Sequence, residues 1–158
     1  MLKKYKPYII SILIALSVGI LSALSTKENM EIYEKINRPF LSPPPFVFPV
    51  VWSILFVLMG IGSARVYVNR DKDTSSARNG LLVYASQLAV NFLWSIIFFN
   101  MQKYLFAFIW LILLWFLILK MIKLFSKVDS IAAYLQIPYL LWVTFAGYLN
   151  LMIYLLNR

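Results

Sequence analysis

Cysteine and histidine are both absent from the sequence. Without cysteine the chain can form no disulfide, thiolate metal site or cysteine nucleophile. Without histidine it lacks the commonest general base and the commonest metal and haem ligand. No serine has a base partner that would activate it for nucleophilic catalysis. The sequence therefore indicates no metal, no resident cofactor and no firm catalytic residue.

Acidic residues are scarce as well, and they lie between the apolar runs, not inside them. This excludes a carboxylate that relays protons or binds coupling ions within a membrane. The net charge of +9 arises from lysines and arginines at the ends of apolar runs, where a membrane explains them. No basic stripe of the kind that nucleic-acid binding requires is present, so nucleic acid is not an expected partner. The six acids are Glu28, Glu31, Glu34, Asp71, Asp73 and Asp129.

Charged residues of both signs make up only 13% of the chain, and 62% of its residues are apolar. Soluble domains carry roughly 25% charged residues, so this chain lacks the polar surface of a soluble domain. Its 158 residues leave room for about five membrane spans of roughly 20 residues each. We predict an all-α integral membrane protein, a bundle of five transmembrane helices in a single membrane domain over residues 1–158.

The apolar runs predict where the five helices lie. An alternative interpretation of the first run is a cleaved signal peptide, but its apolar stretch exceeds the roughly 7–15 residues of such segments. We also predict a short helix near residues 31–36, a soluble loop at 69–79, and a kink at Pro138 inside the last helix. The helices are expected at approximately residues 7–25, 46–68, 80–100, 104–125 and 130–156, with loop one at 26–45.

The distribution of basic residues predicts the orientation in the membrane. Ten lysines and arginines fall on the side of the N-terminus and five on the other side. Cytoplasmic loops carry an excess of these residues. The N-terminus is therefore expected in the cytoplasm and the C-terminus outside.

Three of the predicted helices carry rows of aromatic, amide and small residues at helical spacing. Helix 104–125, in contrast, is apolar on all sides, which indicates a helix that faces lipid. One interpretation of the rows is packing, with Asn and Gln bonding across helices. The other is a pocket whose aromatic walls stack on a flat ligand and whose amides orient it. The rows are Phe48, Trp52, Phe56 and Gly60; Gln87, Asn91, Trp94 and Phe98; and Pro138, Trp142, Ala146 and Asn150.

Two pairs of small residues lie one helical turn apart. They are Ala85 with Ala89, and Gly60 with Ala64. Such pairs allow close approach of two helices, either within one chain or between two chains. They are compatible with a dimer without requiring one.

Several motifs occur in order along most of the chain and resemble the translocator protein family, also called tryptophan-rich sensory proteins (TspO/MBR). The similarity extends from about residue 33 to 157. Its first part looks like the family's KPxxxPP…VF…VW pattern, and the later parts are similar to its third- and fifth-helix motifs. The matching segments are Arg38–Pro44, Val47–Phe48, Val51–Trp52, Asn91–Trp94, Phe98–Phe99 and Pro138–Asn150.

The resemblance implies a five-helix bundle that binds porphyrins such as protoporphyrin, and also sterols, in a pocket that opens toward loop one. It also implies a homodimer in the lipid bilayer. Six ligand-binding residues carry over by position: Tyr33, Trp52, Asn91, Trp94, Trp142 and Ala146. The helical rows add Phe56, Phe98 and Asn150 to the expected pocket.

The leading hypothesis is a membrane protein that binds protoporphyrin-type tetrapyrroles, and sterols or other flat hydrophobic ligands, as a sensor, transporter or scavenger. Lys35 or Arg38 in loop one would then pair with the carboxylates of the ligand. One alternative is enzyme-like, light- or oxidant-dependent degradation of porphyrin with Trp52 and Trp142 as redox-active neighbours. Another is a ligand-free structural or regulatory membrane partner.

Overall fold

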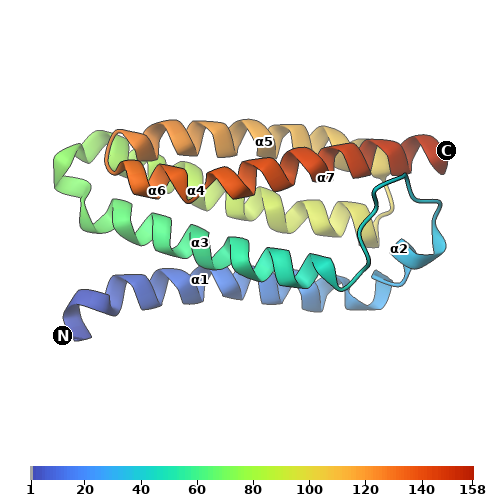
Figure 1. Cartoon of the computed structure of the whole chain (residues 1–158), viewed down its shortest axis with the longest axis horizontal. Coiled ribbons are helices and arrows are strands. Elements are labelled where there is room, and N and C mark those ends of the chain that lie inside the picture. The colour runs from blue at the N-terminus through green and yellow to red at the C-terminus, as the bar shows by residue number, and fades with distance from the viewer. Residues whose placement is uncertain (1) are drawn as a thin grey trace.

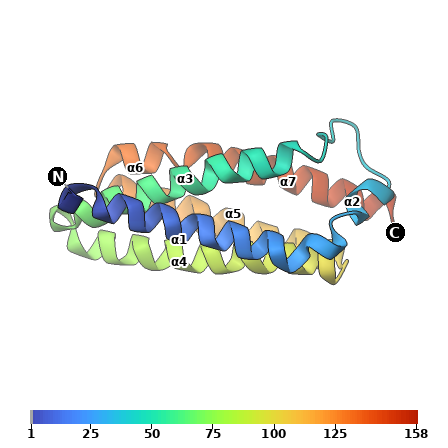
Figure 2. The same ribbon diagram turned by 90° about the horizontal axis from the view of Figure 1, so that it is seen from below.

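The computed structural model describes residues 2–158, and every regular element in this range is helical. Five stretches are long and apolar enough to cross a membrane. They run side by side along the long axis of the molecule, with the two termini at opposite ends (Figures 1 and 2). The predicted five-helix membrane bundle is thus confirmed, and the chain is a multi-pass membrane protein. The elements are α1 (Leu2–Thr26), η1 (Lys27–Asn29), α2 (Ile32–Lys35), α3 (Val47–Val68), η2 (Arg70–Lys72), α4 (Thr74–Ser95), the π-helical turn η3 (Ile96–Asn100), α5 (Tyr104–Ser126), α6 (Ser130–Tyr134) and α7 (Ile137–Leu156).

The third span begins earlier than the sequence predicted. Helix α4 starts at Thr74, whereas we expected a loop to continue to residue 79. The cause is a helix cap, because Asp73 accepts hydrogen bonds from both the backbone amide and the hydroxyl of Ser76. The same two bonds hold the pKa of Asp73 below its ordinary value. A polar stretch that we interpreted as loop is therefore the first turn and a half of a helix.

The fifth span is broken, and the predicted kink at Pro138 is wrong. Helix α6 ends at Tyr134 and α7 begins at Ile137, so Pro138 lies in the first turn of α7. Proline is well tolerated there because its missing N–H would have no partner in any case. The buried Gln136 lies at the break, and its side-chain amide donates to the carbonyl of Leu58 on α3 at 3.3 Å. The interruption is thus held against a neighbouring helix.

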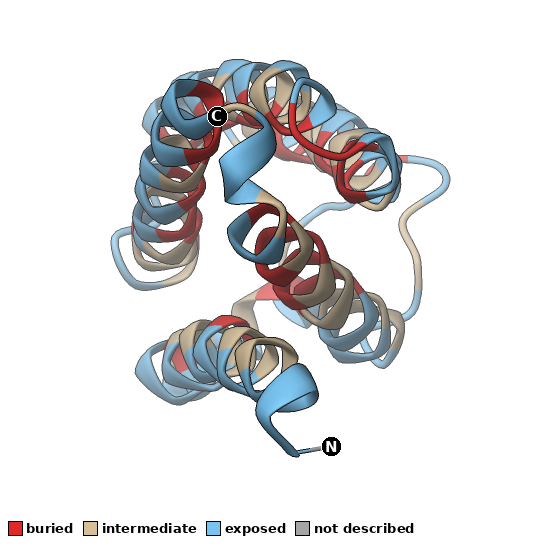
Figure 3. Cartoon of the chain, turned by 90° about the vertical axis from the view of Figure 1, so that its left-hand side faces the viewer, coloured by how far each residue is buried: buried red, intermediate tan, exposed pale blue. Residues whose placement is uncertain are grey.

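Helix α1 begins at Leu2, five residues before the expected start, and its main packing partner is α3. The contact is close because Gly60 faces α1. A Cβ atom at that position would lie 2.5 Å from the Cα atom of Ile12. The Gly60–Ala64 pair therefore serves packing within the chain. Figure 3 shows that α1 borders the bundle, while buried residues concentrate on the other helices.

Helix α5 does not face lipid on all sides, so this prediction is wrong for one of its faces. A stripe at spacings of three and four residues is buried, and α5 packs against both α4 and α7. Because nearly every residue of this helix is apolar, composition cannot reveal which face is covered. The stripe consists of Ala107, Leu111, Leu114, Ile118, Met121 and Phe125.

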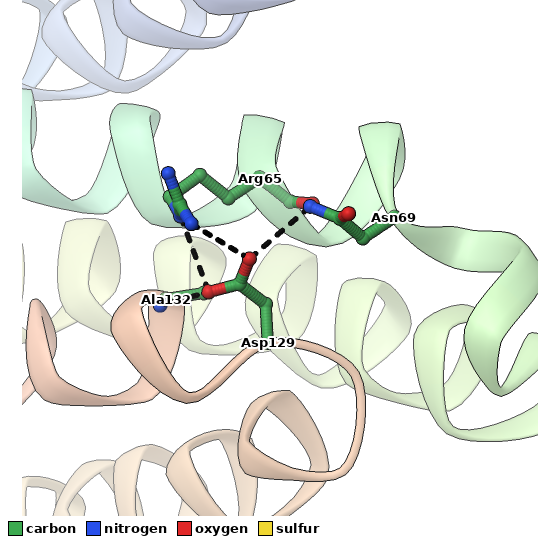
Figure 4. Close-up of polar contacts among 4 residues, drawn as sticks. All are labelled: Arg65, Asn69, Asp129 and Ala132. Carbon is green, nitrogen blue, oxygen red and sulfur yellow. Dashed lines mark hydrogen bonds and ion pairs between the residues drawn. The ribbon is translucent and has the colours of Figure 1, made fainter.

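An ion pair at the end of the molecule opposite loop one ties α3 to the turn before α6 (Figure 4). The guanidinium of Arg65 donates to both carboxylate oxygens of Asp129, at 3.1 and 2.9 Å. Asn69 and the backbone amide of Ala132 donate to the same carboxylate, at 3.1 and 2.9 Å. Burial alone raises the pKa of Asp129, but the hydrogen bonds from Arg65 and the backbone amides outweigh it and lower that pKa. The carboxylate is therefore held in its charged form.

Candidate functional site

A cavity of about 440 Å³ lies in the half of the bundle nearest loop one. This volume falls within the roughly 300–1,000 Å³ that is usual for small-molecule sites. Its walls come from α1, the α2 segment, α3, α4, η3 and α7, and most of the lining is apolar. The described residues of α5 and α6 do not line it. The five-helix plan thus leaves a sizeable apolar space between four of its spans.

All nine residues predicted to bind a ligand line this one cavity. They come from five elements, of which only α4 and η3 are directly adjacent in the sequence, and the fold brings them together. Their role in ligand binding itself stays a prediction. Tyr33 comes from α2; Trp52 and Phe56 from α3; Asn91 and Trp94 from α4; Phe98 from η3; and Trp142, Ala146 and Asn150 from α7.

Aromatic rings form much of the wall and brace one another. Trp52 and Trp142 meet edge to face, with ring centroids 6.5 Å apart and planes at 89°. On another part of the wall, Trp94 and Phe98 stack at 5.2 Å with an angle of 28°. Edge-to-face and offset-stacked pairs are the favoured aromatic arrangements. The rings are therefore held in place, so the walls are preorganised for a flat hydrophobic molecule.

One pair of polar side chains in the cavity is fully engaged with the protein. Trp94 donates from its indole nitrogen to Asn150 at 3.0 Å, and the amide nitrogen of Asn150 donates to the carbonyl of Tyr104 at 2.8 Å. Asn150 therefore connects α4 to the start of α5 and fixes the indole plane of Trp94. At this position the packing interpretation and the pocket interpretation both apply.

A second network runs from the cavity wall into the core. Asn91 donates to the hydroxyl of Tyr139 at 2.7 Å, and that hydroxyl donates to the side-chain carbonyl of Gln87 at 2.6 Å. Gln87 is fully buried and does not line the cavity, so for this residue the packing interpretation is the better one. The sequence pattern did not single out Tyr139, because its partners lie on another helix.

One polar atom near the cavity has no partner. The indole nitrogen of Trp142 is buried and makes no hydrogen bond to any part of the chain that the structure describes. A buried donor left unpaired costs about 1–3 kcal/mol. Trp142 lines the cavity with other atoms of its side chain, whereas this nitrogen is itself covered by the protein.

Loop one borders the exposed end of the cavity, its mouth, and is fastened at several points. The hydroxyl of Tyr33 donates to the carbonyl of Pro43 at 3.1 Å, and the hydroxyl of Tyr148 on α7 donates to that of Phe40 at 2.8 Å. Asn157 accepts from the backbone amide of Asn37 at 3.0 Å and donates to its carbonyl at 2.8 Å. The loop is therefore bound to the C-terminal end of α7.

The two basic residues expected to pair with ligand carboxylates do not line the cavity. The Lys35 ammonium lies 4.0 Å from the carboxylate of Glu31, and the Arg38 guanidinium lies over the ring of Tyr33 at 4.8 Å. Two acids, Glu31 and Glu34, line the mouth instead.

Sequence reasoning missed the contribution of α1, which carries scattered serines but no row of amide or aromatic residues. Gly19 allows α1 to lie against the wall, since a Cβ atom there would be 2.7 Å from the ring of Phe56. Phe48 was noticed in a helical row but left out of the predicted site, although it meets Trp142 edge to face at 5.9 Å. The α1 residues of the lining are Leu16, Gly19, Ile20, Ser22, Ala23 and Thr26.

The fold and the cavity define a class: multi-pass α-helical membrane proteins with an internal, largely aromatic cavity. Within that class, the model of the TspO/MBR family matches residues 11–156, and the chain belongs to this family. It is 37% identical to the tryptophan-rich protein TspO of Chlorobaculum tepidum over 145 residues, 91% of each chain. It is 38% identical to protein CrtK of Rhodobacter capsulatus over 125 residues, 79% of this chain and 78% of the relative. It is 32% identical to the translocator protein of Homo sapiens over 123 residues, 78% and 73% of the two chains.

Proposed function

We propose that this protein binds flat, hydrophobic tetrapyrroles of the protoporphyrin type in the aromatic cavity, and acts as a membrane sensor, transporter or scavenger of that ligand. The observation that carries the proposal is the convergence of three tryptophans, Trp52, Trp94 and Trp142, on one apolar space. Flat conjugated rings are bound well by stacking and by burial of apolar area. Family membership supports the proposal, since relatives carry the names tryptophan-rich sensory protein and translocator protein.

The lining is mostly apolar with a few polar side chains, which supports a ligand with a large apolar body and a few polar groups. Tetrapyrroles are of this kind, because their apolar rings carry nitrogen atoms and their edges carry carboxylates. Sterols share the apolar body and carry a hydroxyl, so they are the second ligand class to test. For either class, most of the binding free energy comes from contact with the walls.

The test is titration of the detergent-purified protein with protoporphyrin, followed by quenching of its five tryptophans. We expect saturable quenching, because three of the five line the cavity, and no saturation with unfolded protein in the same micelles. Thermal unfolding provides a second measurement, since a ligand at 100 times its Kd stabilises the folded state by about 2.7 kcal/mol. A thermal midpoint that no porphyrin or sterol changes would contradict the proposal and favour a ligand-free structural or regulatory partner.

A second candidate is light- or oxidant-dependent degradation of the bound porphyrin. The edge-to-face contact of Trp52 with Trp142 favours it, because two oxidisable indoles adjoin the space where the ligand would lie. Illumination of the complex would then give new absorbance products, and Trp142→Phe would abolish them while binding is retained. Unchanged porphyrin after illumination would leave binding as the function.

We further propose a homodimer, with Ala85 and Ala89 at the contact. Both residues are exposed on the outer side of α4, where small side chains allow a second helix to approach closely. The N-terminus is proposed to lie in the cytoplasm and the C-terminus outside, because ten of the fifteen basic residues belong to the N-terminal side.

A further inference from the structure

The mouth of the cavity is acidic. Of the described residues that line the cavity, two are charged, and both are acids: Glu31 and Glu34. Both side chains belong to the loop-one segment at the exposed end of the cavity. The interior beyond them is walled by aromatic and aliphatic groups. A charged group on a ligand therefore has to remain at the mouth, beside these two carboxylates, since burial in the apolar interior would be far more costly.

The nearby basic side chains offset this charge only in part. Lys35 lies 4.0 Å from Glu31 and offsets part of its charge, and both side chains are 76% exposed. The guanidinium of Arg38 lies over the ring of Tyr33, and Arg38 does not line the cavity. Glu34 makes no ion pair with any residue that the structure describes. Of the two acids that line the mouth, Glu34 thus keeps its full negative charge and Glu31 keeps it in part.

We propose that Glu31 and Glu34 act as a charge filter, so that among flat tetrapyrroles the cavity binds those with the fewest carboxylates most tightly. This inference rests on the proposed function and adds a selection rule to it. It reverses the role first expected for loop one, in which basic residues would attract carboxylates. Each ligand carboxylate at the mouth is repelled by the two glutamates, and the repulsion grows with the number of carboxylates.

The experiment compares three porphyrins that share one ring but differ in charge: protoporphyrin dimethyl ester, protoporphyrin, and a coproporphyrin with four carboxylates. Each is titrated at low ionic strength against the wild type, the Glu31→Gln/Glu34→Gln double variant, and Glu28→Gln. Glu28 is a matched control because it is an exposed acid of the same loop that does not line the cavity. Partitioning of each porphyrin into the micelle is the same for every variant, so the comparison is made between variants.

In the wild type we expect the ester to bind most tightly and the coproporphyrin most weakly. The double variant should lower the Kd of protoporphyrin about fivefold and that of coproporphyrin by about tenfold or more. The ester should change by less than about twofold, because it has no charge to repel. Added salt should weaken these differences, since it screens exposed charges.

Equal binding of the three porphyrins by the wild type, or equal effects of the double variant and Glu28→Gln, would overturn the charge filter while leaving the proposed function intact. Absence of saturable binding by all three would overturn the proposed function, and the filter with it. Circular dichroism should show that the variants are folded, because Glu→Gln changes at exposed positions of a loop should not disturb the helices.

Discussion

Replacing Trp142 by Ala should weaken porphyrin binding without disturbing the bundle. Trp142 lies on α7, and its ring is braced by Phe48 at 5.9 Å, by Trp52 at 6.5 Å and by Phe145 at 5.6 Å. The change removes one wall of the cavity together with the only buried indole nitrogen that has no partner in residues 2–158. The neighbouring rings belong to other turns and other helices, so the helix itself should remain.

The magnitude follows from two contributions. An aromatic contact with the ligand is worth about 0.5–1.5 kcal/mol beyond burial. Loss of roughly 40 Å² of apolar contact adds about 1 kcal/mol at 25 cal/mol/Å². The sum is about 2 kcal/mol, which corresponds to an increase of about thirtyfold in Kd. Trp142→Phe keeps a ring of smaller area, so we expect a smaller increase of about fivefold, from the loss of about 1 kcal/mol of apolar contact.

Binding is best followed by the visible absorbance of the porphyrin, because this signal does not depend on how many tryptophans remain. The matched control is Trp115→Ala. Trp115 is half-buried on α5, donates to Thr144 at 2.8 Å, and does not line the cavity. Its removal should leave Kd within about twofold, although it costs one hydrogen bond of about 1 kcal/mol in stability. Equal losses at the two positions would refute the assignment of the cavity as the binding site.

Three further predictions concern the remaining features. Asp129→Asn should lower the thermal midpoint at neutral pH by an amount equivalent to about 2 kcal/mol, because it leaves Arg65 partly buried without its partner. The folded-state pKa of Asp129 is lowered, so the stabilisation that its carboxylate provides is fully present above about pH 4 and is lost as the pH falls through that pKa. The difference in stability between the variant and the wild type should therefore shrink at that low pH. A reporter at the C-terminus should be active outside the cytoplasm and one inserted at residues 70–72 inside, and the same side for both would contradict the five-span topology. Ala85→Leu with Ala89→Leu should shift the detergent-solubilised protein from dimer to monomer, and an unchanged size on crosslinking would assign these alanines no role in association.

The number, order and approximate bounds of the spans could be predicted because a bilayer imposes length and apolarity on each helix separately. The rows of aromatic and amide residues could also be found, since a helix places every third or fourth residue on one face. For Trp52, Asn91, Trp94 and Trp142 this was enough to identify side chains that meet in one cavity. Each of these is a large ring or an amide that lies at helical spacing from others of these kinds.

Features that depend on contacts between helices could not be predicted in the same way. Helix α5 is apolar throughout from residue 105 to 119, so its sequence does not show which face is covered. Helix α1 carries serines but no row of amides or aromatic residues, so its sequence does not show that it lines the cavity. The partner of Asn91 is Tyr139, and no periodicity within one helix reveals a bond to another. The break before α7 was not predicted. Pro138 indicated a kink inside one continuous helix, and nothing in the sequence showed that Gln136 would bond to α3 and hold an interruption there.

The hydrogen bonds between Asn157 and loop one make the C-terminal end of α7 a support for the loop that borders the mouth of the cavity. Two hydrogen bonds join the side chain of Asn157 to the backbone of Asn37: the side-chain oxygen accepts from the amide at 3.0 Å, and the side-chain nitrogen donates to the carbonyl at 2.8 Å. Any group attached just beyond this residue, such as an affinity tag, competes for the space and the bonds that hold the loop. Ligand affinities measured on C-terminally and N-terminally tagged protein should therefore differ, and the N-terminal position is the one that leaves the mouth of the cavity unchanged.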